Sequence, residues 1–198
     1  SRLYLRQIGK VFSAPLVSSY GSTETGHVFM ECEAGRLHQN SEHCRVDFQP
    51  WLSRHGGPRR GRLLVTVFHN PWFVVLRFDI GDVARLDDRG PCPCGRGGGM
   101  VLEAIEGRVA DVTFDHEGNA VTVDDLDAAL APIAGIMAWQ LDLPAPGNLQ
   151  LMVISEPGRS RPACRQARER LMEIYGDKAK IEAMTVKALQ HEASGKFR

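Results

Sequence analysis

The sequence contains no stretch of about 18 apolar residues, the length that a membrane-spanning helix needs. Its first six residues, Ser-Arg-Leu-Tyr-Leu-Arg, lack the apolar core of a signal peptide. No long run of one charge sign is present, and 24 Lys and Arg balance 24 Asp and Glu. These absences argue against a nucleic-acid partner and against a membrane partner, and they predict a soluble, cytoplasmic protein.

The chain does contain the residues of an ordinary globular protein, 43% hydrophobic and 24% charged. This composition excludes a disordered, collagen-like or coiled-coil chain, and 198 residues suffice for one or two domains. The five cysteines are an odd number without a secretory signal, which disfavours a disulfide framework and favours metal ligation or burial. The three tryptophans are expected in the core or on strand faces.

The first half of the chain has a β pattern. Cys44, Val46 and Phe48 alternate with Arg45 and Asp47, which is the period of a strand with one buried face. The Gly- and Pro-rich stretch 90–99 can form neither a helix nor an interior strand. After the end of a helix near the N-terminus, strands are expected at 15–19, 44–48, 62–68, 73–78 and 100–105, with a turn-like segment at 20–26.

Beyond Glu106-Gly-Arg108 the pattern changes to a mixture of helices and strands. Thr122 can cap a helix that runs to Leu130, with Asp124 and Asp125 in its first turn. We therefore predict an α+β fold with a β-rich domain, 1–106, and a smaller α+β domain, 107–198. In the second domain, strands are expected at 109–114, 137–143, 149–154 and 180–189, and a second helix at 162–175.

The stretch Tyr20-Gly-Ser-Thr-Glu24 combines an aromatic ring, a glycine, two hydroxyls and a carboxylate in five residues. These groups suit a nucleotide, because a ring can stack on a base and a hydroxyl can donate to a phosphate. A carboxylate can also hold Mg²⁺ against phosphate oxygens. An ordinary polar loop is the alternative interpretation of the same residues.

Three further features each carry a weak signal. Arg77–Asp82 is an apolar strand that ends in a Gly-Asp turn, and an acidic residue at a strand end is a common partner of ribose hydroxyls. Gly107-Arg108 places a cation at the expected domain boundary. Ser194-Gly-Lys196 places a lysine on a flexible tip close to the C-terminus.

The order of these four motifs resembles the adenylate-forming superfamily, which includes acyl-CoA synthetases and the adenylation domains of peptide synthetases. Within it, Glu31–His38 and Cys92-Pro-Cys-Gly-Arg96 are similar to the phenylacetate-CoA ligase branch. The resemblance extends from Tyr20 to the end of the chain. It implies the β-rich C-terminal part of a large AMP-binding domain, followed by a small mobile α+β lid domain.

The resemblance implies an ATP-dependent acid–CoA ligase, which forms an acyl-AMP and pyrophosphate from a carboxylic acid and ATP and then transfers the acyl group to the thiol of coenzyme A. In this family the C-terminal domain rotates between the two steps. The implied contacts are Tyr20 at the adenine, Thr23 at the α-phosphate, Glu24 at Mg²⁺, Asp82 at the ribose hydroxyls, Arg108 near the ribose and phosphates, and Lys196 at the carboxylate and α-phosphate during adenylation. Gly21 and Ser22 of the same motif are implied to belong to the nucleotide-binding residues.

Two departures from the family pattern qualify this expectation. The phosphate-gripping loop rich in Ser, Thr and Gly has no counterpart in the 198 residues, so we expect the back half of a longer enzyme, inactive alone. Ala110 stands where the family hinge often has an acidic residue or Lys. The expected partners are ATP, coenzyme A, a carboxylic acid that the branch resemblance implies is aromatic, and the N-terminal half. A homodimer is left open.

Two rival functions remain. An adenylation enzyme could pass the acyl group to the phosphopantetheine of a carrier protein instead of to coenzyme A. A non-catalytic, zinc-stabilised binding module could keep the shape without the chemistry. A phosphate loop upstream in the parent gene would favour an enzyme over a binding module.

The cysteines form a separate feature. Two thiolates from the knuckle at Cys92 and Cys94, with Cys32 and His38, would complete a four-coordinate structural zinc site. Four unrelated reduced side chains are the alternative. Cys44 is excluded from this set because it should face the core.

Overall fold

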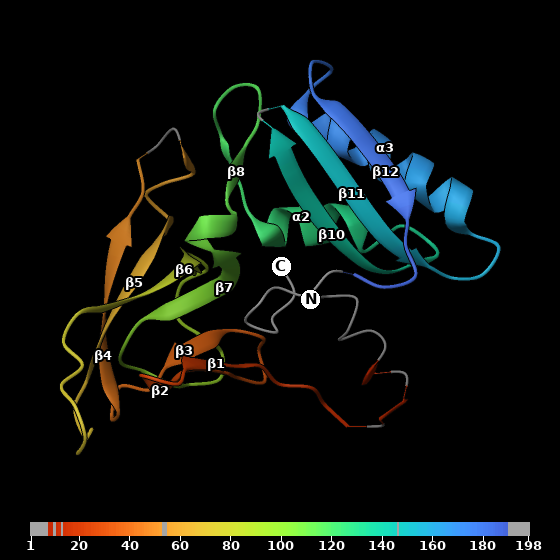
Figure 1. Cartoon of the computed structure of the whole chain (residues 1–198). Helices are drawn as coiled ribbons and strands as arrows, with labels where there is room; N and C mark the ends of the chain where they lie inside the picture. Colours follow the sequence, from red (N-terminus) through yellow and green to blue (C-terminus); the bar gives the residue numbers. More distant parts are fainter. Residues whose placement is uncertain (1–7, 10, 13, 53–54, 146, 190–198) are drawn as a thin grey trace. The chain divides into compact units, whose positions relative to one another are not determined.

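The computed structural model describes residues 8–9, 11–12, 14–52, 55–145 and 147–189. The chain separates into two compact units, one formed by Ser13–Val112 and one that contains the residues from Thr113 onward. Figure 1 shows the strands and helices of both units, coloured along the sequence. The boundary that the sequence suggested, between 106 and 107, lies inside the last strand of the first unit.

The first unit is built on one seven-stranded antiparallel sheet with the order β1-β2-β3-β7-β6-β5-β4. One face of it buries a cluster that includes Phe29, Val46 and Leu63. Cys44 and Val46 are buried while Arg45 between them is exposed, which confirms the predicted alternation. The strands are β1 Ser19–Ser22, β2 Gly26–Glu31, β3 Leu37–Gln39, β4 Cys44–Pro50, β5 Arg60–Val67, β6 Phe78–Leu86 and β7 Val101–Arg108.

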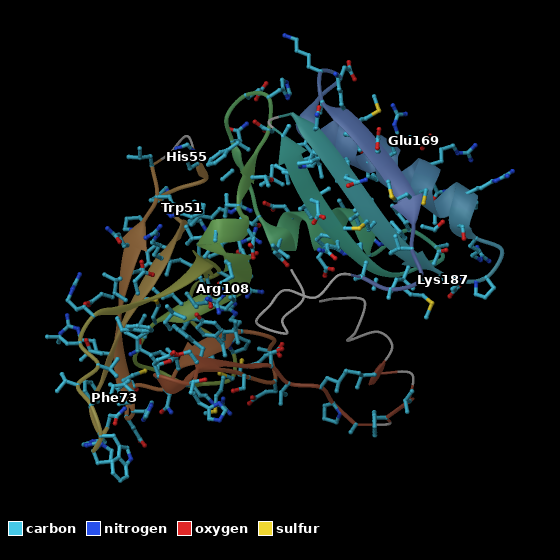
Figure 2. All side chains as sticks on the ribbon, viewed as in Figure 1. Trp51, His55, Phe73, Arg108, Glu169 and Lys187 are labelled. Atoms are coloured by element: carbon cyan, nitrogen blue, oxygen red, sulfur yellow. The ribbon has the colours of Figure 1, made fainter. Side chains whose placement is uncertain are left out.

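The strand predicted at Phe73–Phe78 is wrong except for its last residue, because 73–77 belong to the loop between β5 and β6 and β6 begins at Phe78. The side chain of Asn70 accepts hydrogen bonds from the backbone N–H groups of Trp72 and Phe73, so local turn chemistry prevails over the β propensity of the apolar residues. Trp72 is 88% exposed, which contradicts its expected place in the core. Figure 2 shows Phe73 at one end of the first unit.

Glu106 explains why 106–108 is strand and not linker. Its carboxylate is almost completely buried in β7 and lies 2.7 Å from Nε of both Arg60 and Arg85. A buried carboxylate between two guanidinium groups is fixed by its partners, because it cannot return to water without separating from both. After β7, the residues Val109–Asp111 form a short 3₁₀ helix, so the strand predicted at 109–114 is wrong in its first half.

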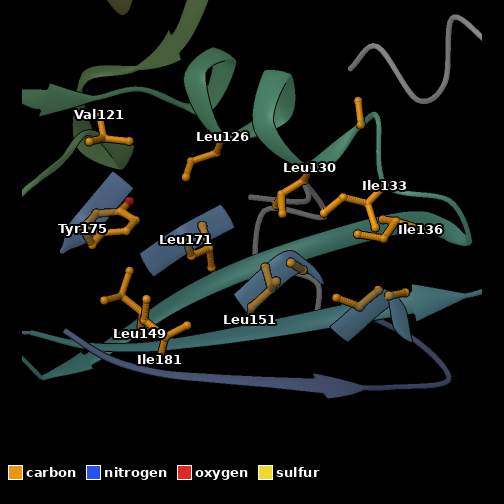
Figure 3. Close-up of a cluster of buried hydrophobic side chains, with 14 residues drawn as sticks. Val121, Leu126, Leu130, Ile133, Ile136, Leu149, Leu151, Leu171, Tyr175 and Ile181 are labelled. Atoms are coloured by element: carbon orange, nitrogen blue, oxygen red, sulfur yellow. The ribbon is translucent and has the colours of Figure 1, made fainter. Parts of the chain in front are cut away.

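The second unit pairs a three-stranded sheet of order β10-β11-β12 with two helices. Strands β11 and β12 are parallel, and helix α3 connects them. Figure 3 shows the core that results, in which Leu130, Leu151 and Leu171 are fully buried. The elements are β8 Thr113–Phe114, β9 Ala120–Val121, α2 Val123–Leu130, β10 Ile136–Ala145, β11 Asn148–Ser155, α3 Ser160–Tyr175 and β12 Lys180–Thr185.

Helix α2 begins as the sequence predicts. The Thr122 side chain accepts a hydrogen bond from the Asp125 N–H, and the Asp125 carboxylate accepts one from the Thr122 N–H at 2.9 Å. This reciprocal pair is a capping box, which satisfies two backbone donors at the helix start. Among the described residues, none of the helices has the length and apolarity to cross a membrane.

Candidate functional site

The Tyr20–Glu24 motif forms a tight hairpin. Residues Ser19–Ser22 are strand β1, and the chain turns at Thr23–Thr25 into β2. A Cβ atom at residue 21 would stand 1.8 Å from the carbonyl oxygen of Gly26, so only glycine fits there. Gly26 has a φ of +65°, which also favours glycine. The two glycines thus let the strands approach closely and bring Thr23 and Glu24 to the exposed tip.

The two hydroxyls of the motif have different surroundings. The Ser22 Oγ lies 3.0 Å from the Thr25 Oγ1 and accepts a hydrogen bond from the Thr25 N–H at 3.2 Å. Thr25 is buried, and its carbonyl oxygen lies 2.9 Å from a ring nitrogen of His43. Ser22 is therefore committed to the turn, whereas the Thr23 side chain is exposed and accessible to a ligand.

Tyr20, Asp82 and Arg108 meet, although they come from three strands. The Tyr20 hydroxyl donates a hydrogen bond of 2.8 Å to Oδ2 of Asp82, which lies 62 positions further along the chain. The Arg108 Nε lies 3.1 Å from Oδ1 of the same carboxylate. Asp82 on β6 is the register partner of Arg108 on β7. Of the predicted nucleotide contacts, these three are brought directly together.

Asp82 lies inside strand β6, not on a turn after a strand. Gly81 before it has a φ of +82°, and the β5–β6 register shifts between Arg62 and Leu64 on the facing strand. A positive-φ glycine and a register shift together make a bulge, which re-aims the side chain that follows. The glycine–aspartate pair therefore marks a bulge inside the strand and not the turn after a strand that the sequence predicted.

Burial, and then the hydrogen bond to Asp82, raise the pKa of Tyr20 well above its ordinary value. Tyr20 therefore keeps its proton and remains a donor to Asp82 at neutral pH. Its ring also packs against Phe29, with the ring centroids 6.3 Å apart. Each carboxylate oxygen has two acceptor positions, so Asp82 can still accept hydrogen bonds from the hydroxyls of a ligand.

A shallow pocket of about 240 Å³ opens beside the hairpin tip. It lies between the β1–β2 turn and the loop that follows β5, and the Tyr20–Asp82–Arg108 group is not part of its lining. The lining residues are Thr23, Glu24, Thr25, Gly26, His43, Val67, His69, Asn70, Pro71 and Trp72.

The four predicted zinc ligands also come together. Cys32 Sγ lies 3.6 Å from Cys92 Sγ, and Cys94 Sγ lies 3.5 Å from Nε2 of His38. All four donor atoms lie within 4.8 Å of one another. Cys44 is not among them and is buried in the core of the first unit, as expected. This donor set could hold a metal ion.

The two cysteine turns share a pattern that spacing alone did not reveal. Cys32–Arg36 and Cys92–Arg96 both read Cys-x-x-Gly-Arg. In each turn the glycine has a positive φ, 68° at Gly35 and 76° at Gly95. Its N–H donates to the carbonyl oxygen of the cysteine three residues earlier, at 2.9 and 3.2 Å respectively. The sequence therefore contains two matching turns.

Sequence reasoning overlooked Arg36, which fixes the loop of the second turn. Arg36 is 8% exposed, donates through Nη1 to the carbonyl oxygen of Gly90 at 2.7 Å, and lies 3.4 Å from the Asp87 carboxylate. Hydrogen bonds from Arg89 are the main cause that lowers the pKa of Asp87 to about 2. The loop that bears Cys92 is thus bound at both Asp87 and Gly90.

Burial by itself would raise the pKa of Cys32, but hydrogen bonds outweigh it and lower the pKa below its ordinary value. The largest of these come from the backbone N–H groups of Arg36 and Ala34, followed by those from Cys92 and Cys94. Burial raises the pKa of Cys92. The cluster thus favours a thiolate at Cys32 first, and thiolates are the form that binds metals.

The predicted role of Lys196 cannot be placed, because this residue lies outside the described residues. Cys164, in the second unit, is partly buried and packs against the core of that unit.

The fold is that of the C-terminal portion of adenylate-forming enzymes. A 2-hydroxyisobutyryl-CoA ligase in the postadenylation state, in complex with 2-HIB-AMP, has a TM-score of 0.75 at 17% identity over 96% of this chain. An anthranilate CoA ligase in complex with anthranoyl-AMP gives 0.65 at 15% identity over 98%. The A-PCP didomain of a carboxylic acid reductase from Segniliparus rugosus, in complex with AMP, gives 0.65 at 14% identity over the whole chain.

The chain spans 43%, 40% and 31% of the lengths of these three proteins. No protein-family model and no curated protein sequence matches the chain. At these identities the similarity concerns the fold, and the function has to be argued from the residues.

Proposed function

We propose that this chain is the C-terminal portion of an ATP-dependent ligase that activates a carboxylic acid as acyl-AMP and transfers the acyl group to the thiol of coenzyme A. The observation that supports this most directly is the group formed by Tyr20, Asp82 and Arg108. These residues are far apart in the sequence, and the family resemblance implies a nucleotide contact for each of them. The complexes with acyl-AMP among the structures of the same fold support the proposal further.

The residues of this group fit a nucleotide. Asp82 is 9% exposed and held by a phenol and a guanidinium group, so its carboxylate is fixed in one orientation. A fixed carboxylate suits the paired hydroxyls of a ribose, because it can accept a hydrogen bond from each. Arg108 is about half exposed and presents a cation at the same place, where it can face phosphate oxygens.

The hairpin tip fits the metal–phosphate end of the nucleotide. Glu24 and Thr23 are exposed neighbours at the turn, a carboxylate and a hydroxyl, which are oxygen ligands of the kind that Mg²⁺ prefers. The tight turn that follows β1 keeps both side chains within four residues of Tyr20. Bound Mg²⁺ would neutralise the negative charge that gathers on the phosphates.

Lys196 is proposed to supply a positive charge at the α-phosphate in addition to Mg²⁺ and Arg108. During adenylation, negative charge builds on the oxygens of the α-phosphate, and an ammonium placed there stabilises the transition state. The lysine would be brought to the site by rotation of the second unit and removed for the thiol transfer. The missing N-terminal half would provide the phosphate loop and most of the acid pocket, so the chain alone would be inactive.

The branch resemblance points to an aromatic acid and coenzyme A as the substrates. Transfer to a carrier protein is a second candidate, and the A-PCP didomain of carboxylic acid reductase among the structures of this fold favours it. A non-catalytic module stays the alternative to both. The enzyme is expected to work in the cytoplasm, and a homodimer is compatible with the proposal.

The decisive experiment uses the longer protein that the parent gene encodes. We expect exchange of radioactive pyrophosphate into ATP that depends on a carboxylic acid, tested across phenylacetate, benzoate and short aliphatic acids. Addition of coenzyme A or of a phosphopantetheine carrier would then show which thiol accepts the acyl group. Absence of acid-dependent exchange with every acid, in a folded full-length protein, would contradict the ligase proposal and leave the binding module.

A further inference from the structure

Four potential metal ligands come together where two turns of the first unit meet. The four donors are three thiol sulfurs and one imidazole nitrogen, and they belong to the β2–β3 connection, to β3, and to the connection between β6 and β7. Cys32 and His38 are 3% and 6% exposed. Three thiols and an imidazole are the donor set of a Cys₃His zinc site.

The distances agree with a tetrahedral zinc ion. With Zn–S bonds of about 2.3 Å and a Zn–N bond of about 2.0 Å, two sulfurs of one site stand about 3.8 Å apart and a sulfur and a nitrogen about 3.5 Å apart. The Cys32–Cys92 sulfurs are separated by 3.6 Å, and Cys94 Sγ lies 3.5 Å from the His38 nitrogen. A disulfide needs two sulfurs about 2.0 Å apart, so the spacing favours metal ligation over a bridge.

Backbone N–H groups of both turns point at the sulfurs. The N–H groups of Ala34 and Arg36 donate to the Cys32 sulfur, and the N–H of Cys94 donates to the Cys92 sulfur. Hydrogen bonds of this kind orient ligands and tune their charge around a metal. In both Cys-x-x-Gly-Arg turns the glycine adopts a positive φ and its N–H donates to the carbonyl oxygen of the cysteine three residues earlier.

We propose that Cys32, His38, Cys92 and Cys94 bind one Zn²⁺ in a closed, structural site that fastens the β3–β7 seam of the sheet. The four protein ligands complete a tetrahedron and leave no position for a substrate, which separates this site from any catalytic metal. The proposal does not rest on the proposed ligase function, because it concerns the stability of the first unit and not its chemistry.

The β3–β7 seam has few register pairs of its own, so a metal ion there would add to the stability of the sheet. Strand β3 has three residues and only two register pairs with β7, Leu37 with Leu102 and His38 with Val101, whereas β4 and β5 share seven pairs. Within the described sheet, this seam joins β1, which carries Tyr20, to the strands that carry Asp82 and Arg108. Zinc held between β3 and the β6–β7 connection would therefore preserve the arrangement in which Tyr20 reaches Asp82.

The first experiment measures zinc by elemental analysis of the purified 198-residue chain, kept reduced. We expect about one zinc per chain in the wild type and in Cys164→Ser, a matched control whose thiol lies in the second unit. Cys92→Ser and Cys94→Ser should lose most of the metal. A folded, reduced wild type without zinc that also fails to take it up on titration, or a Cys92→Ser variant with full zinc content, would overturn the site.

A second variant separates loss of a ligand from misfolding. His38→Cys exchanges one zinc ligand for another, so it should keep one zinc, while His38→Ala should not. Replacement of the metal by Co²⁺ should give the intense visible bands of tetrahedral cobalt with thiolate ligands in both the wild type and His38→Cys. Weak octahedral bands in the wild type would contradict the proposed ligand set.

The clamp role has its own test. Removal of zinc by a chelator should lower the thermal midpoint of the wild type by several degrees and leave Cys92→Ser, which has no metal to lose, unchanged. The Tyr20 environment, followed by ultraviolet absorbance, should change with the metal. If the zinc leaves and neither the midpoint nor the absorbance changes, the metal binds but does not fasten the seam, and the clamp is refuted.

Discussion

Asp82 links three strands of the first unit and is also the proposed partner of the ribose hydroxyls. Its carboxylate joins strand β1 to strands β6 and β7 through the Tyr20 hydroxyl and the Arg108 guanidinium group. A substitution of Asp82 would therefore change the packing of these strands as well as any ligand contact that the carboxylate makes. A test of its function must therefore compare substitutions that remove the carboxylate with substitutions that remove only one of its partners.

The first prediction is that Asp82→Ala raises the KM for ATP about tenfold or more in the full-length enzyme, with a smaller effect on kcat. The reason is that ribose binding is used in the ground state and in the transition state alike. Tyr20→Phe, which removes one link and keeps the carboxylate, should raise KM less. Asp88→Ala is the control, since Asp88 is 60% exposed in its side chain and pairs only at the surface with Arg59. Steady-state ATP titrations measure all four, and equal KM values for wild type and Asp82→Ala would refute the assignment.

The second prediction concerns alkaline pH. The raised pKa of Tyr20 means that the folded protein keeps this proton at a pH where the unfolded chain, with an ordinary pKa of about 10, has lost it. The contribution of the Tyr20 proton to the free energy of unfolding should therefore be fully present below about pH 10 and be lost as the pH rises further. Tyr20→Phe should be less stable than the wild type at neutral pH but lose less stability above pH 10. Urea unfolding at a series of pH values measures this, and parallel losses in both proteins would contradict the raised pKa.

At the scale of elements, local sequence signals predicted a helix or strand correctly where the structure of that segment depends on neighbouring residues alone. Thr122, Asp124 and Asp125 predicted the start of α2 correctly. The capping box of Thr122 and Asp125 satisfies two backbone N–H groups with side chains only three residues apart, so the signal is local. The strand prediction within the loop at 68–77 failed because contacts, and not local propensity, decide the structure there. Its apolar residues favour a strand, yet the Asn70 turn and the pairing of β6 further along the chain decide its structure, and neither appears in a propensity count.

The site shows the same division. Sequence could identify Tyr20, Asp82 and Arg108 as separate motifs, but their meeting depends on the order of seven strands, in which β7 is inserted beside β3. The bulge at Gly81 likewise depends on the facing strand β5. Chemistry and spacing identify the four proposed zinc ligands, whereas Arg36, which donates a hydrogen bond to the loop that bears Cys92 and Cys94, carries no sequence signal that sets it apart from the other arginines.

The third prediction tests the capping box of α2. Thr122→Ala should lower the free energy of unfolding of the second unit by about 1 kcal/mol, because the N–H of Asp125 loses its acceptor where water has little access. Thr122→Ser keeps the hydroxyl and should retain most of the stability. Chemical denaturation followed by circular dichroism measures both, and a Ser variant as unstable as the Ala variant would show that the lost methyl group, and not the cap, matters.

At the scale of the whole molecule, the chain has two cores that belong to different units. The first core lies on a β sheet and the second lies between a sheet and helices, and each is closed by residues of its own unit. Because a unit with its own core can move as a body, the fold is compatible with a lysine that acts in one step and leaves for the next. The described residues of the second unit end before that lysine.

The last prediction uses Lys196 to separate the two half-reactions of the proposed enzyme. An ammonium that stabilises charge at the α-phosphate matters for adenylate formation and little for the later attack of the thiol. Lys196→Ala in the full-length enzyme should therefore slow adenylate formation by about 10²-fold or more, the size of effect known for the loss of one preorganised donor. Thiolysis of a supplied acyl-adenylate should stay within a few-fold of the wild type. Lys187→Ala, at an exposed lysine of the same unit, is the control and should change neither rate. Single-turnover assays of each step measure these rates. Similar losses in both steps would indicate a folding or docking defect, and no loss in either would leave Lys196 without a role in the chemistry.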